Sequence, residues 1–573
     1  MNILGICNAN NSGAALIVDG KVIAAVNEER FIRVKQTRDF PENAINYVLK
    51  VGHLTLDEVD YIGCGAWAGI DSEETLPSLM HEFSTKVKQG DWVADIAFDR
   101  LNASIKSDGE AKTKLIRDAE KFGISRTRIH FCDHHRSHAL TAFYPSEFEE
   151  AIVLVADGRG DFRAVSIWEA SRTNGMKCLH TVSEMNSLGA MYGYITKLLG
   201  FIPDRHEGKV TGLSARGEPS EVFEMLSNAI RFNTENGGIE AMYGDIYLPF
   251  MDASLSYLED LAKAIPKENL AYAAQAVLEK TLSEYLSFYL EKFYKGKKVN
   301  LCLSGGCAAN VKLNFELSKL SQVKSLYVSP EMGDGGNALG GAINCLVNFT
   351  SLQWVEMQTV YLGPEYSNDH IADTLAKEGV LSKKLVGKSK LNFVADELEN
   401  GKIIGWFQGR MEYGPRALGA RSILASPSDS TINDALNQRL NRTEFMPFAP
   451  VTTDELASKL FVSWDKKDQA SRFMTICYEC TDLFRNKCPA TVHVDNTARP
   501  QVISEVHNPE YFNLIELFYQ KTGIPSLINT SFNHHEEPIV CSPEDAIRSF
   551  LKGNVDILVI GDFVVTSSKQ NNF

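Results

Sequence analysis

Two apolar runs joined by a tight turn decide the fold, in residues 14–29, which read AALIVDGKVIAAVNEE. Asp19-Gly20 separates the runs, and this dipeptide is a strong signal for a two-residue turn between antiparallel strands. Residues 2–7, NILGIC, predict a strand before them, and residues 40–52, FPENAINYVLKVG, predict a helix that ends at a glycine. The chain therefore opens with a β-rich unit followed by a helix.

The same pattern returns at residues 151–170, which read AIVLVADGRGDFRAVSIWEA. A strand, a turn rich in Asp and Gly, and a second strand follow one another there. A duplicated β-β-β-α unit is how the actin-like ATPase fold is built, with a nucleotide bound between its halves. We therefore predict an α/β protein whose N-terminal domain is actin-like, of the duplicated ribonuclease-H-like (ASKHA) class.

Two glycine-rich turns follow later in the chain, each before an expected helix. Residues 299–317 read VNLCLSGGCAANVKLNFEL, and residues 330–344 read PEMGDGGNALGGAIN. Backbone N–H groups at such helix starts point at anions. A single glycine-rich turn is weak evidence, but two within forty residues favour a nucleotide or phosphate site.

Three histidines lie within five positions in residues 132–143, CDHHRSHALTAF. On a helix, His134 and His138 share a face while His135 points elsewhere. Two imidazoles on one face can bind a metal ion, although two ligands are rarely enough. The alternative for an isolated pair is simple packing on a helix face.

Composition excludes several classes of protein. The 573 residues carry a net charge of −15, which disfavours nucleic acid and anionic membranes as partners. No apolar run is long enough to span a bilayer, and the N-terminus does not read as a secretory signal. The eleven cysteines are scattered, as in a reduced cytoplasmic protein, so we expect a cytoplasmic location. A zinc site at Cys477, Cys480 and Cys488 is less favoured than inert thiols, because a second Cys-x-x-C is missing.

The sequence changes character around residues 346–366, which predicts a first domain at 1–355 and a second at 356–573. The second part contains WFQGRMEYGPRALGARSILASP, followed by HVDNTARPQ and SLINTSFNHHEEPIV. Arginine forks suit phosphate oxygens, and glycines let a backbone approach a ligand closely. For Arg410, a surface ion pair is an equally good reading. Anion binding is favoured for Arg416, Arg421 and Arg499.

Taken in order, the motifs carry a family resemblance. HHRSHALTAF, ADGRGD, HEGKVTGL, LSGGCAANVKLN, GDGGNALGGA, GRMEYGPRALGARSIL, MPFAP, HVDNTARPQ and NTSFN…EPIV resemble the O-carbamoyltransferases of the nodulation and antibiotic-tailoring type. The match runs from residue 3 to about residue 565. The resemblance implies an ATP-dependent enzyme with a YrdC-like α/β second domain, in which carbamoyl phosphate and ATP form carbamoyl-adenylate and pyrophosphate. Metal-assisted transfer to a hydroxyl of a sugar or secondary metabolite would follow in the first domain.

The resemblance also implies roles for particular residues. The metal ligands would be His134, His138, Asp157 and Asp334, with Fe²⁺ as the expected ion and His135 in a supporting or structural place. The adenylate would be bound by Gly305, Gly306 and Asn310. Lys35 and Lys209, in the first domain, are candidate cations for phosphate or carbamoyl oxygen; the alternative is that each is only a surface charge. In the second domain, carbamoyl phosphate and Mg²⁺-bound ATP would contact Arg416, Arg421, Arg499, Asn529 and Ser531. His138, Lys35, Arg416, Arg499 and Ser531 would be the catalytic set.

Four positions depart from the pattern of the relatives. Asn10 replaces a histidine, Leu440 and Met446 replace two cations, and Glu536 stands where relatives often have glycine. Arg439 or Arg442 are candidates to replace the missing cations.

Two other functions compete with the carbamoyltransferase. A tRNA threonylcarbamoyl enzyme is disfavoured by the acidic charge, because tRNA binding needs a cationic face. An actin-like ATPase regulator would leave the arginine-rich second half without a function. The identity of the hydroxyl acceptor and the oligomeric state are left open by the sequence.

Overall fold

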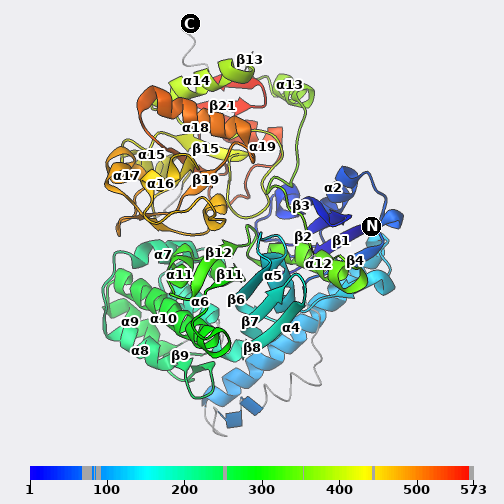
Figure 1. Cartoon of the computed structure of the whole chain (residues 1–573), viewed down its shortest axis with the longest axis vertical. Coiled ribbons are helices and arrows are strands. Elements are labelled where there is room, and N and C mark those ends of the chain that lie inside the picture. Colours follow the sequence, from blue (N-terminus) through cyan, green and yellow to red (C-terminus); the bar gives the residue numbers. More distant parts are fainter. Residues whose placement is uncertain are drawn as a thin grey trace. The chain divides into compact units, whose positions relative to one another are not determined.

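The chain folds into two compact units of mixed helices and strands (Figure 1). The computed structural model describes residues 1–66, 81–82, 84–85, 92–248, 255–352, 354–441 and 446–566. The first unit consists of Met1–Ile23 and Arg38–Glu356, and the second consists of Ala24–Thr37 and Met357–Phe573. The second unit thus includes Ala24–Thr37, a segment that the ranges expected from the sequence assign to the first domain.

Two five-stranded sheets of the same topology form the framework of the first unit. Their strand orders are β3-β2-β1-β4-β5 and β12-β11-β6-β7-β8. In each sheet the first strand pairs antiparallel with the second and parallel with the fourth, as β1 does with β2 and β4, and β6 with β7 and β11. The duplication predicted from the two hairpins is therefore confirmed. The strands are β1 (Asn2–Cys7), β2 (Gly13–Val18), β3 (Lys21–Asn27), β4 (Tyr61–Cys64), β5 (Ile129–Phe131), β6 (Glu150–Gly160), β7 (Arg163–Ser171), β8 (Gly175–Ser183), β11 (Val299–Ser304) and β12 (Val323–Val328).

The first hairpin has the turn that its sequence predicts. Asp19 and Gly20 both have positive φ, 48° and 80°, which a two-residue turn of the kind favoured by Asp-Gly requires. The strands around it are buried and rich in Ala, Val, Ile and Leu, so the hairpin packs into the core of the unit.

Helices α5 (His134–Phe143) and α12 (Asn337–Phe349) lie between the two sheets. Helix α12 contacts β1 and β4 of one sheet, and α5 contacts β6 and β11 of the other. Glycines permit the close approach: a Cβ at Gly63 of β4 would lie 2.0 Å from the carbonyl oxygen of Gly341. The layer of α5 and α12 brings two sequence-distant segments together at the ends of the strands.

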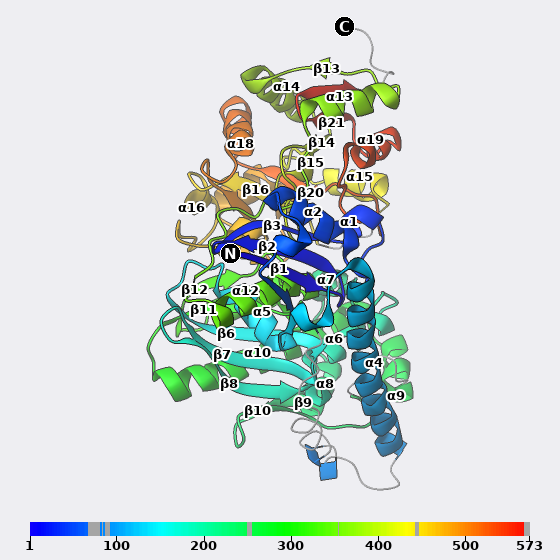
Figure 2. The same ribbon diagram turned by 90° about the vertical axis from the view of Figure 1, so that its right-hand side faces the viewer.

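The remaining helices and strands cover the outside of this framework. Figure 2 shows the long helix α4 (Trp92–Phe122) running beside the sheets. The other elements of the first unit are α2 (Glu42–Gly52), α6 (Leu188–Leu198), α7 (Glu207–Ser214), α8 (Glu221–Ala229), β9 (Ile230–Asn233), β10 (Gly238–Ala241), α9 (Ser256–Ala264), α10 (Lys267–Tyr294) and α11 (Val311–Ser318).

An eight-stranded sheet forms the centre of the second unit, in the order β13-β22-β21-β14-β15-β20-β16-β19. Alternate residues enter two separate apolar clusters: Phe407 packs in one and Trp406 in the other, as expected for a sheet covered on both faces. Helices α13 and α19 contribute to the first cluster, and α14 and α18 to the second.

The elements of the second unit have the following bounds: α1 (Glu29–Ile32), α13 (Asn368–Lys377), β13 (Lys383–Lys384), α14 (Gly387–Glu399), β14 (Ile404–Phe407), β15 (Arg421–Ala425), α15 (Ile432–Arg439), β16 (Ala449–Thr453), α16 (Ala457–Leu460), β17 (Tyr478–Glu479), α17 (Asp482–Lys487), β18 (Thr497–Ala498), β19 (Gln501–Ile503), α18 (Pro509–Thr522), β20 (Leu527–Ser531), α19 (Pro543–Leu551), β21 (Ile557–Ile560) and β22 (Phe563–Thr566).

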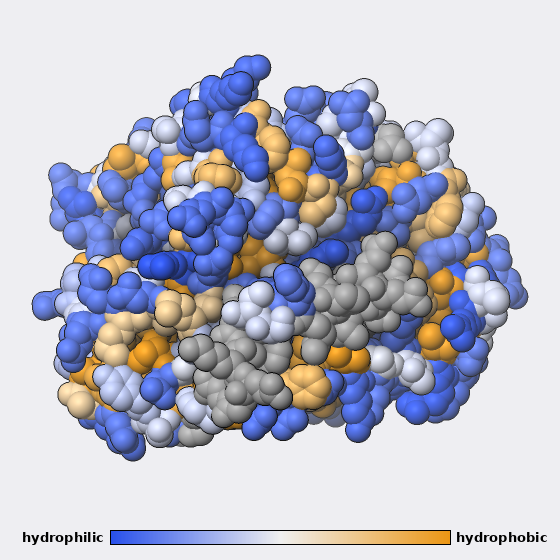
Figure 3. All heavy atoms as spheres, turned by 90° about the horizontal axis from the view of Figure 1, so that it is seen from below, coloured by the Kyte–Doolittle hydropathy of each residue, from blue (hydrophilic) through white to orange (hydrophobic). Residues whose placement is uncertain are grey.

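The surface carries mixed chemistry. In Figure 3, hydrophilic side chains surround smaller groups of hydrophobic ones on the face shown. Among the described helices, none has both the length and the apolar character that crossing a lipid bilayer would take.

Candidate functional site

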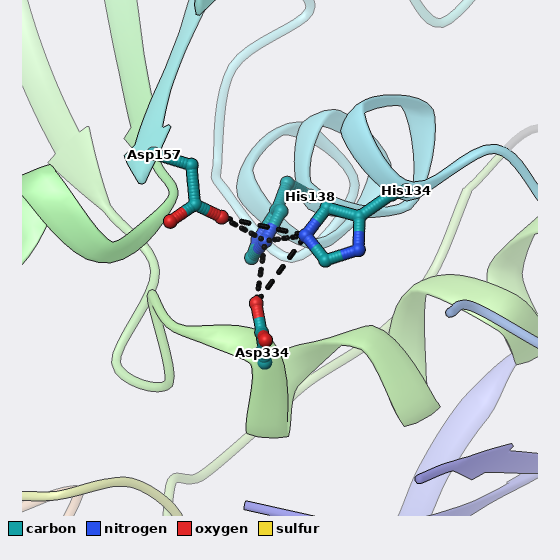
Figure 4. A group of neighbouring side chains, drawn as sticks. All are labelled: His134, His138, Asp157 and Asp334. Atoms are coloured by element: carbon teal, nitrogen blue, oxygen red, sulfur yellow. Dashed lines mark hydrogen bonds and ion pairs between the residues drawn. The ribbon is translucent and has the colours of Figure 1, made fainter. Parts of the chain in front are cut away.

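Four side chains from separate parts of the first unit converge on one point (Figure 4). His134 and His138 come from the first turns of α5, Asp157 from the end of β6, and Asp334 from the turn before α12. The Nε2 atoms of the two histidines are 3.1 Å apart. Each of these nitrogens lies 3.2–3.4 Å from Oδ2 of Asp157 and Oδ1 of Asp334.

The spacing of these atoms fits a metal ion. Ligands about 2.0–2.2 Å from a common ion in tetrahedral or octahedral geometry stand about 2.8–3.6 Å from their neighbours. The observed distances of 3.1–3.4 Å fall within that range. Lone pairs of nitrogen and carboxylate oxygen repel one another unless a proton or a cation lies among them, so these four side chains could hold a metal ion. Two imidazoles and two carboxylates suit a first-row divalent ion.

A hydrogen bond behind His138 fixes its tautomer. The hydroxyl of Ser304, at the end of β11, donates to the carbonyl of Met332 at 3.1 Å. Its oxygen therefore accepts from Nδ1–H of His138 at 3.2 Å, and in the neutral ring this arrangement leaves the Nε2 lone pair facing the other three side chains. The amide of Asn337 lies 3.3 Å from the same Nε2.

Backbone groups orient the other ligands. Oδ1 of Asp157 accepts from the N–H groups of Gly158 at 2.7 Å and Gly306 at 3.3 Å, which turns Oδ2 toward the histidines. Asp133 caps α5 by accepting from the N–H of Arg136, so His134 begins the helix. A Cβ at Gly160 would lie 2.1 Å from the His134 ring, and the glycine therefore makes room for this ligand.

The pKa shifts in this cluster show that it attracts positive charge. Burial by itself lowers the pKa of His134, but Asp334 and Asp157 outweigh burial and hold the pKa well above its ordinary value. Burial raises the pKa of Asp157, but hydrogen bonds from both histidines hold it well below its ordinary value. A divalent ion supplies the same compensation without protons.

His135 faces away from the cluster. Its Nε2 lies 3.2 Å from the carbonyl oxygen of Arg163, and its Nδ1 lies 2.9 Å from the hydroxyl of Ser166. Burial lowers the pKa of this imidazole well below its ordinary value, so it is neutral. His135 therefore points away from His134 and His138, as the helix spacing predicts.

The glycine-rich turn after β11 lies directly against the metal cluster. Gly305 has φ +90°, and a Cβ there would lie 2.3 Å from the carbonyl of Ala156. The N–H of the neighbouring Gly306 donates to Asp157, a predicted metal ligand. The turn after β11 therefore lies next to Asp157, which is near the end of the neighbouring strand β6.

Asn310, predicted as an adenylate contact, belongs to a buried hydrogen-bond network. Its side chain caps α11 and bonds Gln275 of α10 at 2.8 Å and Thr211 of α7 at 3.3 Å. Tyr192 joins the same network through Gln275 and Thr211. Lys209 lies on α7 and is largely buried, so a reading as a mere surface charge does not fit.

Glu207, the second residue of the motif HEGKVTGL, has an unusual acidity that the sequence did not single out. Burial raises the pKa of its carboxyl to about 7, from an ordinary value of 4.5. Its Oε1 accepts from the N–H of Asp204 at 2.7 Å, which offsets only part of the cost of burial.

Replacing Glu207 with Gln is expected to stabilise the protein at pH 8 and to have little effect at pH 4. Between pH 4.5 and about 7 the folded carboxyl keeps a proton that the unfolded chain releases, so stability falls as pH rises. The ionised group then costs up to about 3 kcal/mol above pH 7. Melting temperatures across pH 4–8 measure this. The exposed Glu224 provides the control, because Glu224→Gln should show no such trend.

In the second unit, Glu412 organises the arginine-rich loop. Its buried carboxylate accepts from the N–H groups of Leu418, Ala420 and Arg421 at 2.6, 3.4 and 3.2 Å. This brings the loop from Gly409 to Arg421 around an internal acid. The only signal in the sequence for this role is that Glu412 is the one acidic residue in a stretch of arginines and glycines.

Arg421 has a different place from the one predicted. It is fully buried, stacks 3.6 Å from the ring centroid of Phe407, and donates to the carbonyls of Gln408, Gly409 and Pro364. The glycine-rich setting favoured anion binding, but the guanidinium satisfies carbonyls that this loop leaves unpaired. In this structure its contacts are those of a structural residue.

The other predicted residues of the second unit lie in adjoining segments. Asn529 donates to the carbonyl of Ala417, next to Arg416, and to Gln501, which is two residues after Arg499. Ser531 pairs with Ser422 in neighbouring strands β20 and β15. Arg416, Arg499 and Ser531 are half-buried. Gln501, which the sequence did not single out, thus joins two of the predicted segments.

Lys35 and Arg410 are two further cations that the sequence analysis considered. Lys35 belongs to the second unit, with Ala24–Thr37, and not to the first as expected. Arg410 donates to the carbonyls of Leu362 and Gly363.

The structure gives physical meaning to the departures from the family pattern. Glu536 has φ +63°, a left-handed backbone that glycine adopts at no cost, so glycine is the natural residue there. Leu440 is fully buried in an apolar cluster.

The remaining departures have the following surroundings. Asn10 accepts from Nε of Arg38 at 2.6 Å, Arg439 pairs with Asp556 at 2.7 Å, Met446 is half-buried, and Arg442 lies outside the described residues.

Comparison with known proteins places the chain in a family. Residues 2–343 match the carbamoyltransferase N-terminus and residues 395–567 the carbamoyltransferase C-terminus. The chain belongs to the carbamoyltransferase family, and it is a transferase enzyme.

Individual relatives within this family are similar over most of the chain. The chain is 34% identical to nodulation protein NolNO of Sinorhizobium fredii, over 97% of this chain and 79% of that protein. It is 26% identical to 3'-hydroxymethylcephem-O-carbamoyltransferase of Streptomyces clavuligerus, over 73% of this chain and 80% of that protein. Among solved structures, full-length HypF in a phosphate- and nucleotide-bound form is 12% identical over 62% of this chain and 56% of that chain, with a TM-score of 0.32.

Proposed function

We propose that this chain is an ATP-dependent O-carbamoyltransferase with an actin-like first domain and a YrdC-like second domain. In the second, carbamoyl phosphate and water would give carbamate and phosphate, and an oxygen of carbamate would displace pyrophosphate from the α-phosphate of ATP to form carbamoyl-adenylate. In the first, the carbamoyl group would pass to a hydroxyl of a sugar or secondary metabolite, with AMP as the leaving group. The convergence of His134, His138, Asp157 and Asp334 beside the glycine-rich turn at Gly305 is the observation that carries the proposal.

The residues of the first unit would bind and orient the adenylate. When bound, a divalent ion, Fe²⁺ in our proposal, would supply Lewis-acid polarisation of the carbamoyl carbonyl and charge for the adenylate phosphate. Gly305 and Gly306 would let the backbone of this turn approach the adenylate closely, while their N–H groups donate to the carbonyl of Met332 and to Asp157. Asn310 caps the start of α11. Lys209 would add a positive charge close to these groups.

In the second unit, catalysis would consist of positioning and charge neutralisation. Arg416 and Arg499 would contact the phosphates of carbamoyl phosphate and of Mg²⁺-bound ATP, and Ser531 and Asn529 would orient them. Glu412 and Gln501 keep the segments of these residues in place. We propose that the protein acts in the cytoplasm on a small-molecule acceptor, without nucleic acid or membrane.

Pyrophosphate release tests the proposal. With ATP and carbamoyl phosphate carrying a radiolabelled carbamoyl group, the full chain should release pyrophosphate and place label on AMP. ADP as the sole nucleotide product would refute adenylate formation. The hydroxymethyl cephem named for the Streptomyces relative is a first acceptor to test for carbamoyl transfer.

Replacing Arg499 with Ala is expected to lower both pyrophosphate release and transfer by about 10²–10³-fold, the loss usual for a group that stabilises transition-state charge. Arg485→Ala is the control, because among the described residues this arginine bonds to Asp482 and to the carbonyl of Cys480, both outside the loops that carry the predicted donor contacts. If Arg499→Ala retained normal pyrophosphate release, the arginine would have no part in donor activation.

A further inference from the structure

Residues 24–37 form a bridge in the chain between the two units. The residues before and after them belong to the first unit, yet this segment packs with the second. It leaves strand β3 and contains the four-residue helix α1, Glu29–Ile32. The contacts of this segment show which parts of the second unit it stabilises.

Arg30 holds the arginine-rich loop. Its guanidinium is 4% exposed, and Nη2 donates to the carbonyl of Gly414 at 2.9 Å, two residues before Arg416. Nη1 pairs with Glu29 at 2.9 Å. The second oxygen of Glu29 accepts from the N–H of Gln36 at 2.7 Å, so the pair is fixed from both sides.

Arg33 holds a second loop, which follows Ser531. Nη1 donates to the carbonyl of Ile539 and Nη2 to that of Pro538, both at 2.7 Å. Its Nε lies 3.4 Å from Asp545, which neutralises the charge. A planar fork that donates to two consecutive carbonyls fixes the direction of that backbone.

Phe31 fills the space between these two contacts. It packs against an apolar cluster to which both loops contribute: Met411 and Ala417 from one, Ile539 and Cys541 from the other. Residues 30–33 therefore contact both loops: Arg30 bonds to one, Arg33 to the other, and Phe31 packs against apolar residues of both.

We propose that Arg30 and Arg33 are positioning residues that hold the loops 409–421 and 531–541, hereafter the donor loops, at the spacing that carbamoyl phosphate requires. The inference rests on the proposed function, since it assigns Arg416 and Ser531 of these loops to the donor. Neither arginine touches substrate. A shift of the loops by about 1 Å separates the groups that bind the donor, and misplacement of this size costs up to about 10²-fold in rate.

The test measures pyrophosphate release by the full-length protein as carbamoyl phosphate is varied. Arg33→Gln is expected to raise the KM for carbamoyl phosphate about tenfold or more, because Gln cannot donate to both carbonyls. Arg33→Lys, which keeps the charge and one donated bond, should recover part of that loss. Arg30→Gln should act in the same direction.

Arg172→Gln is the matched control. Arg172 is also half-buried and donates to the carbonyls of Phe148 and Ser146, but it stands at the far end of β7 from the metal cluster and in the first unit. It should lower the melting temperature as much as Arg33→Gln without changing the KM. An unchanged KM in Arg33→Gln, or an equal rise in Arg172→Gln, would overturn the inference. Absence of pyrophosphate release from the unaltered protein would instead refute the proposed function.

Discussion

Replacing His138 with Gln is expected to lower the affinity for Fe²⁺ by about 100-fold or more and to abolish carbamoyl transfer, while pyrophosphate release stays normal. Loss of a residue that merely supports a metal ligand already costs about 10–100-fold in affinity, and His138 would itself be a ligand. Its Nε2 lies within 3.4 Å of a nitrogen or oxygen of each of the other three. Gln cannot place a nitrogen lone pair at that point.

Three measurements check this expectation. Bound Fe²⁺ per chain after anaerobic reconstitution reports the site, pyrophosphate release reports the second unit, and loss of label from carbamoyl-adenylate reports transfer. His135→Gln is the control, since it removes an imidazole from the same helix that faces Ser166 and Arg163 instead. Equal loss of Fe²⁺ in both variants would mean that helix packing, and not ligation, was disturbed. Normal Fe²⁺ binding by His138→Gln would refute the metal site.

The sequence predicted the parts of the fold that local rules govern. The turn at Asp19-Gly20 and the duplicated hairpin follow from strand periodicity and turn chemistry, which act over a few residues. The shared face of His134 and His138 follows from the helical repeat in the same way. Asp157 and Asp334 entered only through the family resemblance, because no local rule connects residues so far apart in the chain.

Sequence rules missed the features that depend on long-range contacts. Arg33 meets Ile539 across 506 positions, so the transfer of residues 24–37 to the second unit has no local signature. Arg421 was predicted to bind an anion because glycines surround it, but its guanidinium donates to the carbonyls of Gln408, Gly409 and Pro364. In both cases the sequence showed an arginine near glycine or proline, and only the three-dimensional backbone decides what that arginine contacts.

Replacing Gly340 with Ala is expected to destabilise the first unit by about 1–3 kcal/mol and to lower the affinity of the proposed metal site for Fe²⁺ at least tenfold. A Cβ at this position in α12 would lie 2.2 Å from Oγ and 2.4 Å from the carbonyl oxygen of Ser137, and 2.8 Å from Oγ1 of Thr141. The carbonyl belongs to the backbone of α5, so a rotamer change cannot relieve the clash. Helices α5 and α12 must separate.

That separation would act directly on the metal ligands. Ser137 lies between His134 and His138 in α5, and Asp334 lies just before α12, so the distance between the helices sets the distance between the ligands. The hydrogen bonds from Ser137 to Asn337 and from Thr141 to Gly336 would lengthen as well. Melting temperature and bound Fe²⁺ measure the two effects. Gly109→Ala is the control, because its Cβ would meet nothing within 4 Å in α4 and alanine favours a helix by about 1 kcal/mol. If Gly340→Ala lost stability but kept its Fe²⁺, the ligands would be positioned by their own strands and turns, and the contact between α5 and α12 would serve the fold alone.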